Sequence, residues 1–193
     1  MESTDRIRRA GFSCIAAGVL WTVAAMMQGA YSLQSSSDGV LYYLNEAMYF
    51  VAHAGFVLGI FGLIWARAAG NGWFGKIALG LFALGWIVLL VGLPLKVITS
   101  NPNLPLFPIG GLATTLGGLL SGIAVAVARR WHGWQRWSVL FYSLFYLSAL
   151  FLPILIANQE PGTPTLIVWG LAWLPIGYAL VSVSSPRAQP ATA

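Results

Sequence analysis

Charged side chains are scarce in this sequence of 193 residues. It contains ten lysines and arginines, five aspartates and glutamates, two histidines and a single cysteine, Cys14. Charged residues therefore make up 8% of the chain, against about 25% in an ordinary soluble domain. A soluble domain of this size needs more polar groups than that to cover its surface, so we exclude this class. A single cysteine also excludes a disulfide framework.

Apolar residues are what the sequence has in abundance. They account for 58% of the chain, aromatic residues for 13%, and the mean hydropathy is +0.77. A bilayer core of about 30 Å needs roughly 20 apolar residues per helix, and six stretches meet that length: 10–31, 45–66, 73–97, 109–128, 137–157 and 164–183. None of them alternates as β-barrel strands do. The sequence therefore predicts an all-α integral membrane protein, one six-helix transmembrane bundle over 1–183, with a flexible tail at 184–193.

The basic residues are distributed unevenly along the predicted bundle. If the helices alternate in direction, nine of the ten fall on one side: Arg6, Arg8, Arg9, Arg67, Lys76, Arg129, Arg130, Arg136 and Arg187. Cytoplasmic segments are enriched in lysine and arginine. We therefore expect both termini to be cytoplasmic, in a bacterial inner (plasma) membrane. The net charge of +5 then reflects topology, and we expect no nucleic-acid partner.

The two halves of the chain show a weak internal similarity. When the first span is aligned with the fourth, Gly11 matches Gly110 and Gly18 matches Gly117. When the third span is aligned with the sixth, Gly80 matches Gly170. Three helices per half would make such a 3+3 repeat inverted, as in many transporters.

The last two spans contain features that interrupt a regular helix or add polarity to it. Pro153 and Pro175 predict kinks in the fifth and sixth spans. Tyr142 and Tyr146 share one face of the fifth span, where they either line a polar cavity or form interhelical hydrogen bonds.

Ionisable groups in the second span form the main candidate site. Glu46, Tyr49 and His53 follow one another at spacings that place them on one helix face. Ionisable groups at membrane depth face protein or water and are often functional. The alternative is that His53 only bonds a neighbouring helix and stabilises packing. Lys96 either snorkels to the headgroups or pairs with Glu46. Together with Gln28, these residues make a candidate ligand-binding cluster.

Small residues recur at intervals of four in two spans. They are Gly110, Thr114, Gly118 and Gly122 in the fourth span, and Gly55 and Gly59 in the second. This spacing lets helix backbones approach closely in lipid, so it predicts helix packing, within the bundle or in a homodimer.

Tryptophan and arginine alternate in the turn before the fifth span. The segment includes Arg129, Arg130, Trp131, Trp134, Arg136 and Trp137. Indole rings favour the headgroup layer, and anionic lipid attracts arginine. We expect this segment to anchor the protein at the membrane interface, with the lipid bilayer as its partner. A docking patch for another protein is the alternative.

The sequence contains no recognisable set of catalytic residues. Only His53 lies within a span and only one cysteine is present, so we expect no metal site, haem or other cofactor. We therefore expect a non-enzymatic protein that binds a small or lipophilic ligand or serves as a subunit of a membrane complex. A membrane enzyme is the less favoured alternative.

A transport component is the more definite alternative. In dimensions only, the chain resembles the substrate-binding subunits of energy-coupling-factor transporters, which are six-helix proteins of about this size. The resemblance implies a contact with a coupling protein through small residues of the first span. Ser13 with Ala17, and Cys14 with Gly18, have the spacing but lack the usual alanine pair.

Overall fold

Long helices account for nearly all of the described chain. The computed structural model describes residues 2–31, 39–101, 104–157 and 159–184, and over these residues it contains helices and turns but no strand. Six helical segments are long and apolar enough to cross a membrane. The prediction of an all-helical protein with six such spans is therefore confirmed. Arg187 and most of the predicted tail lie outside the described residues.

The first four spans are single helices and the last two are broken. The single helices are α1 (Glu2–Ala30), α2 (Val40–Trp65), α3 (Trp73–Thr99) and α4 (Leu106–Ala128). The fifth span runs through η1 (Gly133–Trp137), α5 (Ser138–Phe145), η2 (Tyr146–Phe151) and α6 (Leu152–Ala157). The sixth consists of α7 (Thr163–Leu171) and α8 (Leu174–Val183).

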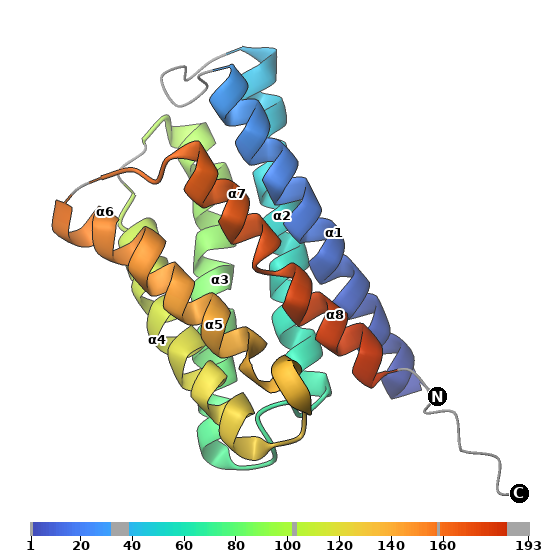
Figure 1. Cartoon of the computed structure of the whole chain (residues 1–193). Coiled ribbons are helices and arrows are strands. Elements are labelled where there is room, and N and C mark those ends of the chain that lie inside the picture. Colours follow the sequence, from blue (N-terminus) through green and yellow to red (C-terminus); the bar gives the residue numbers. More distant parts are fainter. Residues whose placement is uncertain (1, 32–38, 102–103, 158, 185–193) are drawn as a thin grey trace, which may run out of the picture.

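The helices pack mainly against their neighbours in sequence, and the sixth span returns to the first. α1 lies against α2 and against α7 and α8, while α3 lies along α4, and α4 contacts α5 (Figure 1). The first and last described residues, Glu2 and Ser184, are at the same end of the bundle (Figure 1). The direct contact between the fifth and sixth spans is slight.

The sixth span is interrupted just before Pro175, and the fifth departs from a regular α-helix just before the segment that contains Pro153. Pro175 has no N–H to offer the carbonyl of Leu171, where α7 ends. A tight turn bridges the gap, with the N–H of Trp173 bonded to the carbonyl of Gly170 at 3.2 Å. In the fifth span, the π-helical turn η2 immediately precedes the α6 segment that contains Pro153.

Stacked aromatic rings fill the middle of the bundle. Trp173, at the break in the sixth span, stacks on Phe56 of α2 with centroids 4.4 Å apart and lies parallel to Phe82 of α3 at 6.2 Å. Trp86 of α3 and Tyr142 of α5 complete a cluster in which every side chain is fully buried. Four of the six spans thus meet at one aromatic core.

Glycines let α2 approach α1 closely. A Cβ atom added to Gly55 would lie 2.6 Å from that of Ala17, and one added to Gly59 would lie 3.0 Å from Cys14. The predicted small residues of α2 therefore face α1, which meets them with small residues of its own.

The predicted stripe on α4 contacts two neighbours. Gly110 and Thr114 face α3, whereas Gly118 and Gly122 face Ser143 and Leu140 of α5. Because an α-helix turns by about 100° per residue, side chains four residues apart are displaced by about 40° around the helix axis. The stripe therefore moves from the face toward α3 to the face toward α5 along the length of α4. All four α4 residues are buried within the single chain, which removes them from any homodimer contact. Gly117, beside the stripe, makes the tightest contact with α3 because it lies against the backbone of Phe82.

Candidate functional site

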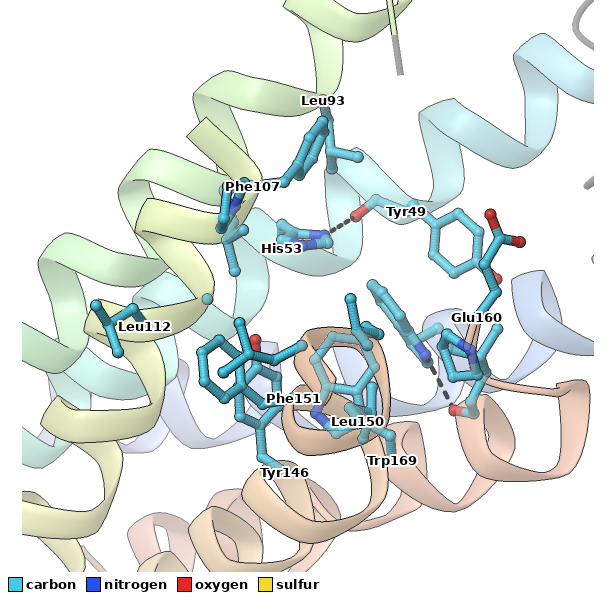
Figure 2. Close-up of a pocket in the computed structure, with 18 of the residues that line it drawn as sticks. Tyr49, His53, Leu93, Phe107, Leu112, Tyr146, Leu150, Phe151, Glu160 and Trp169 are labelled. Atoms are coloured by element: carbon cyan, nitrogen blue, oxygen red, sulfur yellow. Dashed lines mark hydrogen bonds between the residues drawn. The ribbon is translucent and has the colours of Figure 1, made fainter. Parts of the chain in front are cut away.

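A cavity of about 690 Å³, drawn in Figure 2, is lined by residues from the half of the bundle farther from the start of α1 and the end of α8. All six spans contribute to its wall, and most of the side chains there are apolar. Among the lining residues are Trp21, Gln28, Tyr49, His53, Leu93, Phe107, Leu112, Tyr146, Leu150, Phe151, Glu160 and Trp169. Trp86 of the aromatic core contacts two of them, with its ring centroid 5.0 Å from that of His53 and 5.8 Å from that of Trp169. The aromatic core therefore packs directly behind this part of the cavity wall.

One ring nitrogen of His53 forms a hydrogen bond within its own helix, and the other has no hydrogen-bond partner among the described residues. Its Nδ1 donates to the carbonyl of Tyr49 at 2.8 Å, because a carbonyl can only accept. Among the described residues, none hydrogen-bonds to Nε2. The ring is buried, lies 5.1 Å from that of Trp21, and lines the cavity (Figure 2). Nε2 is therefore the imidazole atom that can bind a molecule there.

Polar groups from α1 and α2 meet at one side of the cavity. The hydroxyl of Tyr49 donates to Oε1 of Gln28, which links the two helices. Trp21 Nε1 donates to the carbonyl of Leu166 at 3.0 Å and so ties α1 to α7. Glu160, from the turn between α6 and α7, is exposed and lies on the Tyr49 side in Figure 2. The one acidic side chain among the described lining residues thus sits at the rim of the cavity.

The facing wall comes from the π-helical turn. Tyr146 and Phe151 line the cavity next to Gly111 of α4, where an added Cβ atom would lie 3.3 Å from the Phe151 ring. Tyr142, one turn before Tyr146, accepts a hydrogen bond from Trp169 Nε1 at 3.0 Å. Of the two tyrosines on the predicted face, one makes an interhelical hydrogen bond and the other lines a cavity.

The cavity reaches the side of the bundle between α4 and α6. Four apolar residues line it there although their side chains are exposed: Ile109, Leu112, Ile154 and Leu155. The fifth span is also the least buried of the six, and α6 contacts chiefly the turn that precedes it. The opening therefore faces whatever surrounds the helices, which is lipid if the bundle spans a membrane.

Two members of the predicted cluster lie apart from this cavity. Lys96 Nζ is 2.6 Å from Glu46 Oε1, and their side chains are 23% and 13% exposed. The ammonium group also lies 5.9 Å from the centre of the Tyr42 ring. The structure thus brings Gln28, Tyr49 and His53 to the cavity, and it pairs Glu46 with Lys96 between α2 and α3.

The predicted interface segment divides into exposed and buried members. Trp134 is 52% exposed and stacks on Tyr178, whereas Trp131 is only 2% exposed and belongs to the core. The structure therefore corrects the expected headgroup position of Trp131. Arg129, Arg130 and Trp137 are exposed, and Arg136 is half-buried. The N–H of the Trp131 indole has no hydrogen-bond partner among the described residues.

The sequence offered little signal for the rest of the cavity wall. Trp21, Trp169 and Glu160 line it, but aromatic residues recur along every span and carry no periodic mark of a cavity, and Glu160 lies in a turn. Among the described residues, no three His, Cys, Asp or Glu side chains lie close enough to hold a metal ion. Comparisons with protein-family models, curated proteins and solved structures found no match for the chain.

Proposed function

We propose that the protein binds a small, neutral, lipophilic molecule in the cavity beneath α6. The observation that carries this proposal is the apolar cavity of about 690 Å³ with a single unpartnered imidazole nitrogen in its wall. Ligand sites have volumes of about 300–1,000 Å³ and combine apolar walls with a few polar groups. Nε2 of His53, with its neighbouring nitrogen already donating, suits a ligand hydroxyl or N–H group.

The charges around the cavity favour a neutral ligand. Among the described residues of the wall, Glu160 is the only charged one, and it lies at the rim. Lys96 is the basic residue of the same half of the bundle, and it is paired with Glu46. An anionic ligand would meet no counter-charge inside the cavity, and an uncompensated charge at such depth is costly.

We also propose that both termini are cytoplasmic and that the chain lies in a bacterial inner membrane. The support is the nine-to-one distribution of basic residues. The helix order puts the turns after α2 and α4, with Arg67 and Arg129, at the same end as Glu2 (Figure 1). The cavity then lies in the outer half of the membrane and opens sideways toward lipid.

A transport role is the second candidate, and the contacts of the two halves favour it. Cβ atoms added to Gly11 and Gly18 of α1 would lie 2.8 and 2.7 Å from carbonyls of the sixth span. Their predicted counterparts in α4, Gly110 and Gly117, lie against the third span, Gly110 against the Leu89 side chain and Gly117 against the backbone of Phe82. This pattern supports an inverted 3+3 repeat. However, Cys14 and Ala17 are buried inside the bundle, so a coupling protein would need another surface.

The cavity's opening provides the test of ligand binding. The protein is isolated from native membranes in lipid nanodiscs, and its organic extract is compared by mass spectrometry with that of empty nanodiscs. We expect one neutral lipophilic compound enriched in proportion to the protein. Leu112→Trp should abolish the enrichment by blocking the opening, and Leu116→Trp is the control. The two leucines lie one turn apart on α4 and are 49% and 48% exposed, but only Leu112 lines the cavity. Equal enrichment in both variants would contradict the proposal.

His53 distinguishes a binding role from a packing role. If Nε2 contacts the ligand, His53→Ala and His53→Gln should both lose the enriched compound while their thermal midpoints stay near that of the parent. If His53 only packs, the alanine variant should lose stability, the glutamine variant should recover part of it, and both should keep the compound. The second result would show that the imidazole is no part of the site.

A further inference from the structure

A second hollow, of about 560 Å³, lies at the opposite end of the bundle, between α4 and the start of the fifth span. Its floor is apolar and includes Ile123 and Val127 of α4 and Leu140 of α5. Arg129 and Arg136 line the same hollow. The lining of this hollow therefore combines apolar side chains with two guanidinium groups.

The backbone holds both arginines in place. α4 ends at Ala128, and Arg129 adopts a left-handed conformation with φ of 51° that turns the chain away from the helix axis. The η1 turn is fixed to α8, because Gln135 Nε2 donates to Ser182 Oγ at 2.8 Å and Trp134 stacks on Tyr178. Arg136 sits in this turn, and its guanidinium lies 4.7 Å from the centre of the Trp137 ring.

The charge of these two arginines is not balanced within the described part of the chain. The ion pairs found there join Arg8 to Asp5 and Lys96 to Glu46, and neither involves this hollow. Nε of Arg136 is buried and has no hydrogen-bond partner among the described residues. Carboxylate and phosphate oxygens are the acceptors whose geometry a guanidinium group matches, and no carboxylate is among the described residues that line this hollow.

We propose that this hollow binds one anionic phospholipid. The phosphate lies between Arg129 and Arg136, and an acyl chain lies along Ile123, Val127 and Leu140. The polar and apolar parts of the hollow follow one another in the same order as those of a phospholipid at a membrane boundary. An apolar floor of this kind would add nothing to the binding of a free phosphate ion, so the geometry favours the lipid. The site is independent of the ligand cavity.

The test uses the full chain, delipidated in detergent and titrated with phosphatidylglycerol or with zwitterionic phosphatidylcholine, and binding is read by native mass spectrometry. We expect one phosphatidylglycerol per chain to bind in preference to phosphatidylcholine. Arg136→Gln should weaken it roughly tenfold, since a charge-assisted phosphate contact is worth about that factor. Arg130→Gln removes the same charge from an exposed neighbour that does not line the hollow, and it should leave this binding unchanged.

A second variant tests the acyl chain without risk to the fold. Val127 is 73% exposed, so Val127→Ser should fold normally and still weaken phosphatidylglycerol binding. Equal weakening by Arg136→Gln and Arg130→Gln would overturn the proposal in favour of diffuse attraction. Competition by inorganic phosphate, with Val127→Ser unchanged, would show an ion site and overturn it as well. Equal binding of the two lipids would likewise refute it.

Discussion

Replacing individual glycines by alanine should have opposite effects at two positions that the sequence does not distinguish. A Cβ atom added to Gly80 of α3 meets nothing within 4 Å, whereas one added to Gly117 of α4 meets the backbone N and Cα atoms of Phe82. In a helix, Gly→Ala contributes about 1 kcal/mol through propensity at either site. Overpacking costs about 1–3 kcal/mol, and the upper end applies where the obstacle is backbone that cannot rotate away.

The propensity gain is common to both variants, so their difference in stability equals the overpacking cost. We expect Gly80→Ala to be more stable than the parent and Gly117→Ala to be less stable. At about 3 kcal/mol apart, their thermal midpoints should differ by roughly 6–12 °C. Gly118→Ala should fall between them, because its added Cβ meets the side-chain Oγ of Ser143 at 2.8 Å, which can rotate. Thermal aggregation in one detergent measures all three. Equal midpoints for Gly80→Ala and Gly117→Ala would refute the claim that α3 and α4 touch through their backbones.

Three further predictions concern the ion pair between α2 and α3, the two tryptophans of the interface segment, and the orientation of the chain in the membrane. Lys96→Met should destabilise the protein by about 1–3 kcal/mol by leaving Glu46 uncompensated, and adding Glu46→Gln should restore most of the loss in thermal unfolding. Trp131→Ala should cost about 3–5 kcal/mol because this side chain is in the core, whereas Trp134→Ala should cost about 1 kcal/mol; similar losses would contradict this difference in burial. In intact cells, an impermeant maleimide should label a cysteine at exposed Gly162 but label one at exposed Asn71 only after permeabilisation, and the reverse pattern would invert the proposed topology.

The six spans could be predicted from the sequence because a bilayer requires long apolar runs, and such runs are visible without any knowledge of contacts. The helix ends could not. The first run was predicted to begin at residue 10, but α1 begins at Glu2, and α2 begins at Val40 rather than 45. A helix continues past the hydrocarbon wherever its polar residues tolerate the conformation, and hydropathy does not report that extension.

The candidate site was predictable only along single helices. The spacing of Tyr49 and His53 placed them on one face, and both line the cavity. Glu46 precedes Tyr49 by less than one turn of the same helix, yet it pairs with Lys96 of α3. Periodicity gives the direction of a side chain from its own axis and says nothing about which neighbour approaches at that height. Glu160 joins the wall from the turn between α6 and α7, where no helical periodicity applies.

The cavity exists because the fifth span cannot follow α4 as closely as α2 follows α1. Near the chain ends, Gly122 lies against the backbone of Leu140, and the contact there is as close as those between α1 and α2. Toward the other end, Gly111 meets the ring of Phe151 and the hydroxyl group of Tyr146 instead of backbone. Side chains therefore lie between the π-helical turn and α4 at this level, and α6 continues beyond it with few contacts to the bundle. The same two side chains line the cavity, so the wider spacing of the spans and the wall of the cavity involve one pair of aromatic residues.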